Sequence, residues 1–149
     1  PIVSECPIEG LPSLLEIYDH TDEAKAIELV SLMIDQMLAE GHKYSDIAIL
    51  SFRGAEKSSL LKLDQVGCHT LRKIIGRTEQ GDFIWSEGNV LCDTVYRAKG
   101  RSANCVIVTE VDFEELAENH LRRLFVGLTR ARLRVGLVVS QRAAIHLMD

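Results

Sequence analysis

The chain has 149 residues, of which 46% are hydrophobic and 26% are charged, and its formal net charge at pH 7 is −5. A chain of this length buries roughly 68–70% of the surface that it exposes when unfolded, so it can form a core without disulfides or metals. The composition excludes collagen-like, disordered and disulfide-scaffold proteins. The apolar runs are far shorter than the ~20 residues that span a bilayer, and no charged-then-apolar leader begins at Pro1. We therefore expect one soluble, cytoplasmic domain with no membrane segment.

The four cysteines are widely spaced and form no C-x-x-C pair. This spacing argues against a zinc site and suits a reducing compartment. We expect no metal site and predict core thiols at Cys6, Cys68, Cys92 and Cys105.

Charge is distributed unevenly along the chain. Residues 1–50 contain ten acidic residues and only two lysines, whereas residues 94–142 contain nine basic residues, eight of them arginine, and five acidic ones. Arginine suits forked contacts with phosphate, so the basic half could meet a phosphorylated partner. An ordinary solvated surface would carry the same charges.

Apolar patterning predicts strands that alternate with helices. Apolar runs predict strands at residues 14–18, 46–52, 89–96, 104–111 and 134–140. Apolar spacings of three and four predict two long helices, one capped by Thr21 and ending at Gly41, the other spanning residues 113–132. The pattern predicts a three-layer α/β fold, in which a mainly parallel sheet is flanked by helices.

The remaining segments are expected to be small. A short helix is predicted at residues 58–63, a strand at residues 71–75 and a hairpin turn at residues 79–82. We expect residues 1–149 to form one domain, with residues 1–13 as an extended lead-in and residues 66–89 as a possible small β insertion. Ligands of such folds bind beyond the carboxyl ends of the strands, which are expected after Phe52, Thr94 and Thr109.

A phosphate-binding P-loop is absent from the sequence. That loop reads G-x-x-x-x-G-K-[ST], and no glycine in this chain is followed by lysine. The chain therefore cannot bind and split a nucleoside triphosphate by that device alone.

Arginines surround one glycine in the second predicted helix. Arg123, Gly127, Arg130 and Arg134 lie at spacings of four, three and four, which places them on one helical stripe. The missing side chain at Gly127 could let an anion lie between Arg123 and Arg130. Alternatively, Gly127 packs closely against a strand and the arginines are solvated.

The loop after the predicted strand at residues 89–96 combines a hydroxyl, an aromatic ring and two cations. Thr94, Tyr96, Arg97 and Lys99 supply these groups within six residues. Such groups can hold a sugar-phosphate backbone and stack a base. An ordinary surface loop could also contain them.

Three segments resemble motifs of the UvrD/Rep-type superfamily 1 helicases. T-V-Y-R-A-K-G at residues 94–100, with the strand at residues 105–108, resembles motif V, and L-R-R-L-F-V-G-L-T-R-A-R at residues 121–132 resembles motif VI. Residues 44–53 are similar to the strand before the insertion point of these helicases. The motifs occur in family order, and the resemblance covers residues 14–140.

The resemblance implies the C-terminal RecA-like motor domain, or domain 2A, of a two-lobed ATPase. Only about forty residues separate Phe52 from Thr94, which implies the compact variant without the large inserted subdomain. In this family the P-loop and the magnesium-binding acids lie on an N-terminal RecA-like domain of the same polypeptide, and ATP with magnesium binds between the two lobes. The missing P-loop agrees with this assignment.

The resemblance also implies roles for individual residues. Arg130 would be the arginine finger that reaches the γ-phosphate, and Arg123 would support it. Other residues at the nucleotide would be Lys99, Gly100, Gly127 and one acidic residue, either Asp112 or Glu110. Single-stranded DNA would contact Thr94, Tyr96, Arg97 and Arg53.

The motif V segment differs from the family pattern at two places. Tyr96 stands where histidine is usual, and Arg101-Ser102-Ala103 replaces the usual hydrophobic-Glu-Phe segment. We expect a C-terminal motor domain of an ATP-dependent DNA helicase or translocase, inactive as an isolated fragment. The alternatives are a nucleic-acid or protein adaptor without motor activity, and a stand-alone ligand-binding domain.

Overall fold

The computed structural model describes residues 13–98 and 101–147 of the chain, so the predicted lead-in at residues 1–13 lies almost wholly outside the described part. Its main feature is a seven-stranded sheet with the strand order β1-β9-β8-β2-β7-β4-β3. All neighbouring strands are parallel except β3 and β4, which are antiparallel. The strands are β1 (Ser13–Tyr18), β2 (Ile47–Ser51), β3 (Gln65–Val66), β4 (His69–Arg72), β7 (Val90–Thr94), β8 (Ala103–Val111) and β9 (Ala131–Ser140).

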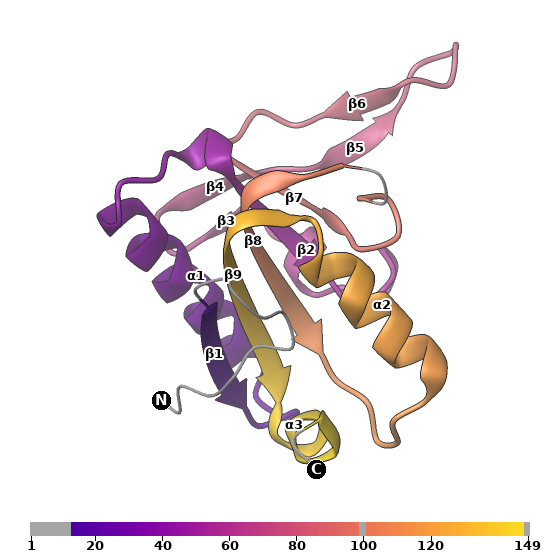
Figure 1. Ribbon diagram of the computed structural model, residues 1–149. Helices are drawn as coiled ribbons and strands as arrows, with labels where there is room; N and C mark the ends of the chain where they lie inside the picture. The colour runs from indigo at the N-terminus through magenta and orange to yellow at the C-terminus, as the bar shows by residue number, and fades with distance from the viewer. Residues whose placement is uncertain (1–12, 99–100, 148–149) are drawn as a thin grey trace.

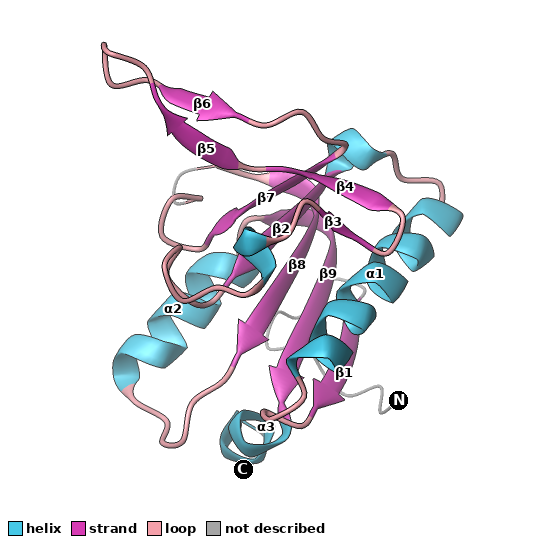
Figure 2. Cartoon of the chain, turned by 180° about the vertical axis from the view of Figure 1, so that it is seen from behind, coloured by secondary structure: helices cyan, strands magenta, loops and turns pink. Residues whose placement is uncertain are grey.

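Helices cover both faces of this sheet (Figures 1 and 2). On one face, α1 (Glu23–Ala39) packs Val30, Met33 and Ile34 against the sheet. On the other face, α2 (Glu118–Leu128) and α3 (Gln141–Leu147) pack against side chains of β8 and β9. Because both faces are covered, the central strands read as continuous apolar runs, and the expected three-layer α/β fold with a mainly parallel sheet is confirmed.

A separate two-stranded hairpin projects from the main sheet. It consists of β5 (Ile74–Arg77) and β6 (Phe83–Trp85), and its turn is closed by hydrogen bonds between Thr78 and Asp82. Both views show it extending past the end at which β8 and β9 begin. The predicted β insertion at residues 66–89 is thus divided, since β3 and β4 join the main sheet.

Two local expectations are wrong. Asp22, not Thr21, caps α1, because its carboxylate accepts a hydrogen bond from the Lys25 N–H while Thr21 bonds to Asp19. The segment predicted as a helix at residues 58–63 contains only a 3₁₀ turn, Leu60–Lys62. Among the described residues, no helix has the length and apolarity needed to cross a bilayer.

Candidate nucleotide and nucleic-acid site

The predicted site residues lie at opposite edges of the sheet. Arg130 immediately precedes β9, and its carbonyl oxygen accepts a hydrogen bond of 3.0 Å from the Ala103 N–H at the start of β8. Glu110 lies near the carboxyl end of β8 and Asp112 lies just beyond it. Seven residues of strand separate Ala103 from Glu110, a distance of roughly 23 Å. The expectation that Arg130 and one of these acids line one site beyond the carboxyl ends is therefore wrong.

The amino-terminal edge of β8 and β9 carries three arginines. Arg130 donates from Nε to the Val126 carbonyl oxygen at 3.2 Å, and Arg132 donates to Ser102 Oγ at 3.0 and 2.7 Å. Arg130 and Arg101 also line a small cavity of about 80 Å³. Among the described residues, no carboxylate forms an ion pair with these guanidinium groups, so they can receive an anion. Lys99 and Gly100, predicted for the same site, lie outside the described residues.

The predicted arginine stripe around Gly127 does not exist as a helical face. Helix α2 ends at Leu128, and Arg134 lies on β9, where it forms a two-pronged ion pair with Glu40 at 2.9 and 2.7 Å. A Cβ atom at Gly127 would lie 3.2 Å from methyl groups of Val95 and Val108. The glycine therefore permits close packing of α2 on β8, and no space for an anion opens there.

The motif V loop presents an aromatic ring backed by a cation. The Tyr96 ring is 55% exposed, and the Arg123 guanidinium lies 4.9 Å from its centroid and 4.7 Å from that of Phe52. Arg123 also donates to the Phe52 carbonyl oxygen at 3.1 Å. These contacts hold Arg123 at a cavity of about 340 Å³, whose lining includes Tyr96, Arg122 and Asn119. Arg123 thus lies with Tyr96, and within the described residues no hydrogen bond joins its side chain to Arg130.

Two other residues predicted to contact DNA instead hold this loop in shape. Thr94 is 3% exposed, and its Oγ1 accepts a hydrogen bond from the Arg97 N–H. Arg97 donates from Nε to Oδ1 of the buried Asp93 at 2.6 Å. Both side chains are therefore occupied within the protein, and among residues 94–98 the exposed side chain is that of Tyr96.

The carboxyl edge of β8 contains a polar network that the sequence pattern does not reveal. Glu110 accepts hydrogen bonds from the hydroxyls of Ser51 and Ser58 and from the Ser59 N–H. Arg53 lies 3.7 Å from Glu110, 3.8 Å from Asp112 and 2.8 Å from Glu23. Three carboxylates thus surround Arg53, which leaves it poorly suited to the predicted contact with DNA. The one available signal was the acidic Glu110 within an otherwise apolar strand.

The Asp112–Arg142 pair at this edge makes a pH-dependent contribution to stability. Hydrogen bonds from Arg142 Nε and Nη2, both 2.8 Å long, hold the pKa of Asp112 below its usual value of 3.8. A carboxylate with a lowered folded-state pKa stabilises the protein above its unfolded pKa and loses that effect as the pH falls through the folded pKa. Arg142→Gln should therefore lower the free energy of unfolding at pH 7, and the difference from wild type should shrink below pH 3.8. Urea unfolding at a series of pH values measures this, and a difference that grows towards low pH would contradict it.

A second group that the sequence did not reveal surrounds His69. The buried imidazole bonds through Nε2 to Asp35 at 2.7 Å and through Nδ1 to the Tyr44 hydroxyl at 2.8 Å, and Cys68 lies beside it. Both ring nitrogens are thus already engaged within the protein. Cys68 is exposed, so the prediction of a core thiol is wrong there, whereas Cys92 and Cys105 are buried as expected. Cys6 lies outside the described residues.

Comparisons with known proteins agree with this fold. Residues 89–138 match the family model of the UvrD-like helicase C-terminal domain. The chain is similar in structure to the C-terminal domain of a possible DNA helicase from Lactobacillus plantarum WCFS1, with a TM-score of 0.58 and 16% sequence identity over 91% of this chain and 80% of that one. A search of curated proteins found no match.

The layered sheet and its flanking helices share the α/β fold of that domain. More specifically, residues 89–138, which run from β7 into β9, are similar in sequence to the UvrD-like helicase C-terminal domain.

Proposed function

We propose that this chain is the C-terminal motor domain of an ATP-dependent superfamily 1 DNA helicase or translocase. The observation that carries the proposal is the match over residues 89–138, which includes both motif segments and Arg130. In this role the domain supplies Arg130 and a single-strand contact, while an N-terminal RecA-like domain supplies the P-loop. ATP then binds between the two domains, against the amino-terminal edge of β8 and β9.

The side chains at that edge fit a triphosphate. Arg130 and Arg132 offer guanidinium donors without carboxylate partners among the described residues, and forked donors of this kind suit phosphate oxygens. Asp93, the carboxylate that lines the same cavity, is already paired with Arg97. Magnesium would therefore be held by the P-loop domain, and this chain would contribute positive charge only.

The positions of Thr94 and Ala103, on either side of the segment that resembles motif V, support a coupling between ATP and DNA. The loop begins at Thr94, at the carboxyl end of β7, and returns to Ala103 at the opposite edge beside Arg130. Arg130 would gain its phosphate partner only when triphosphate is bound, and this differential contact would favour closure of the two domains. The same closure would shift Tyr96 and Arg123 relative to a bound strand.

ATP turnover with and without the P-loop domain tests the proposal. The chain alone should hydrolyse no ATP, whereas a polypeptide that joins it to its P-loop domain should hydrolyse ATP faster with single-stranded DNA. Turnover by the chain alone, or none by the joined polypeptide, would contradict a motor function.

Absence of ATP turnover by the joined polypeptide would favour an adaptor without motor activity. One feature of the sequence speaks for an adaptor, because Arg101 and Ser102 replace the hydrophobic and acidic residues of the usual motif V. An adaptor would retain binding to nucleic acid or protein without any ATP-dependent change.

A further inference from the structure

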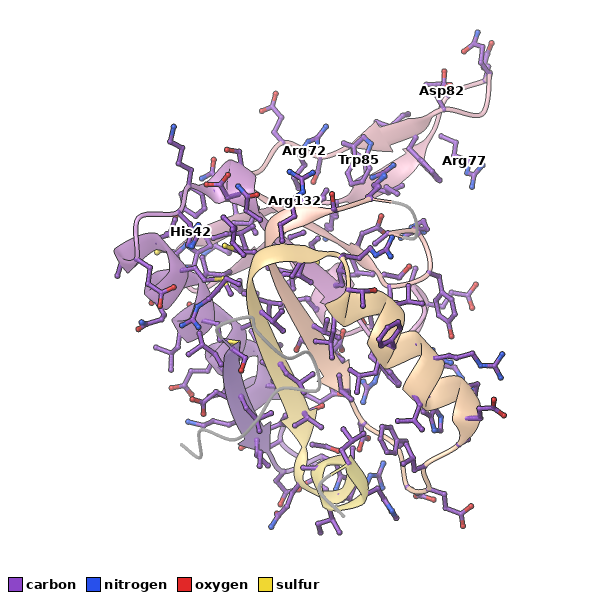
Figure 3. All side chains as sticks on the ribbon, viewed as in Figure 1. His42, Arg72, Arg77, Asp82, Trp85 and Arg132 are labelled. Carbon is purple, nitrogen blue, oxygen red and sulfur yellow. The ribbon has the colours of Figure 1, made fainter. Side chains whose placement is uncertain are left out.

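The β5–β6 hairpin carries arginine–aromatic pairs on one face. Phe83 and Trp85 are two residues apart on β6, so their rings point to the same side of the hairpin. The Arg77 guanidinium lies 4.5 Å from the Phe83 ring, and Arg72 lies 4.9 Å from the Trp85 ring. Figure 3 shows Arg72 beside Trp85 near the base of the hairpin, with Arg77 further out.

The motif V segment adds a third guanidinium to this row. Arg101 lies 5.8 Å from the Trp85 ring centroid, so Trp85 is contacted from β4 and from the segment before β8. Arg101 also lines the cavity beside Arg130. The hairpin row is thus continuous with the basic amino-terminal edge of the sheet.

The guanidinium groups of this row have no carboxylate partner within the described residues. Most other arginines do have one, as in the pairs Arg53–Glu23, Arg97–Asp93, Arg122–Glu118, Arg134–Glu40 and Arg142–Asp112. A guanidinium stacked on a ring keeps its N–H groups at the edge of the stack, where they can donate to phosphate. The row therefore combines aromatic surfaces with free phosphate donors.

Acidic residues limit how far along the hairpin an anion can lie. Glu79 and Asp82 occupy the turn, and Glu87 follows β6; all three are exposed. Figure 3 places Asp82 at the outer end of the hairpin, beyond Arg77. A negatively charged ligand should therefore cross the base of the hairpin, at Arg72, Trp85 and Arg101.

We propose that this row, which consists of Arg72, Arg77, Phe83, Trp85 and Arg101, binds single-stranded nucleic acid as a contact separate from Tyr96. Two successive ring–arginine pairs, about 6.6 Å apart along the strand, fit a ligand that repeats a base and a phosphate. A duplex stacks its bases internally and offers no such faces, and a mononucleotide has only one base. This contact does not require ATP turnover, so it is separable from the motor function.

Trp85 itself provides the measurement, because it is the only tryptophan in the chain. Titration of the 149-residue chain with oligothymidine should quench its fluorescence in a saturable, salt-sensitive way. Arg72→Gln/Arg101→Gln should weaken binding of a labelled oligonucleotide about tenfold and reduce the slope of log affinity against log salt by about 1.4, since each lost phosphate contact contributes about 0.7 for single strands. Lys25→Gln/Lys57→Gln, which removes the same charge from exposed positions elsewhere, is the matched control.

Four outcomes would overturn the proposal. The first is that oligothymidine does not quench Trp85 fluorescence, and the second is that the lysine control loses as much affinity as the arginine variant. The third is that ATP alone quenches Trp85 equally, and the fourth is that oligothymidine no longer quenches Trp85 in Tyr96→Ala. Tyr96→Ala should instead weaken overall binding while Trp85 still responds to the oligonucleotide. Absence of ATP hydrolysis in the joined polypeptide would contradict the motor function and leave this result unaffected.

Discussion

Replacing Arg130 by alanine should lower the ATP turnover of a polypeptide that joins this chain to its P-loop domain by about 10³–10⁵-fold, the range known for arginine fingers. The two donors of the Arg130 guanidinium would stabilise the negative charge that develops on the γ-phosphate during transfer. Loss of this guanidinium should therefore lower the rate of hydrolysis more than the affinity for ATP. Arg130→Lys should remain slow, because an ammonium cannot replace the forked contact.

Substitution of Arg130 should change activity without disturbing the fold. Within residues 13–98 and 101–147, its side chain makes hydrogen bonds only to the Val126 carbonyl oxygen and to Thr129 Oγ1, at 3.2 and 3.5 Å, and supports no buried network. The variant should therefore unfold within a few degrees of wild type and bind a fluorescent ATP analogue normally. Lys57→Ala, at an exposed position on another loop, should retain full turnover. Normal turnover by Arg130→Ala would show that Arg130 is not the finger.

Much of the sheet could be predicted from apolar runs. The strands β2, β7 and β8, and β9 from Val135 onward, are largely buried on both faces, so their sequences are mostly apolar and differ from the amphipathic α1. The carboxyl end of the second helix could not be predicted in the same way. Residues 129–134 continue a helical spacing, but Ala131 pairs with Ala103 in the parallel ladder, and this pairing ends the helix at Leu128. Tertiary pairing overrides local periodicity at that point.

The candidate site was predicted least well where its residues come from distant segments. Motif similarity selected Arg130 and Tyr96 as candidates, but it could not show that Arg123 turns towards Tyr96 and Phe52. The rule that ligands bind beyond carboxyl ends of strands also misplaced Arg130, because the turn after α2 returns the chain to the amino-terminal edge. A single sequence contains no signal for the hydrogen bonds that bring Ser58 and Ser51 to Glu110.

Glu110→Ala should destabilise the protein by about 3–5 kcal/mol, because each buried donor left without an acceptor costs about 1–3 kcal/mol. The change would leave the fully buried hydroxyls of Ser51 and Ser58 and the Ser59 N–H without their shared acceptor. It would also remove a nearby negative charge from Arg53, 3.7 Å away. The melting temperature should fall by roughly 6–20 °C, since 1 kcal/mol corresponds to about 2–4 °C for a domain of this size.

The backbone conformation at Glu110 allows loss of this hydrogen-bond network to be distinguished from a simple loss of packing. Its φ angle is 59°, the left-handed conformation that costs a residue with a Cβ atom about 1 kcal/mol and glycine almost nothing. Glu110→Gly should therefore unfold at a higher temperature than Glu110→Ala, although it removes more atoms, while both remain well below wild type. Thermal unfolding by circular dichroism measures all three. An alanine variant within about 2 °C of wild type would show that the network contributes little, and a glycine variant less stable than alanine would contradict the strain at this position.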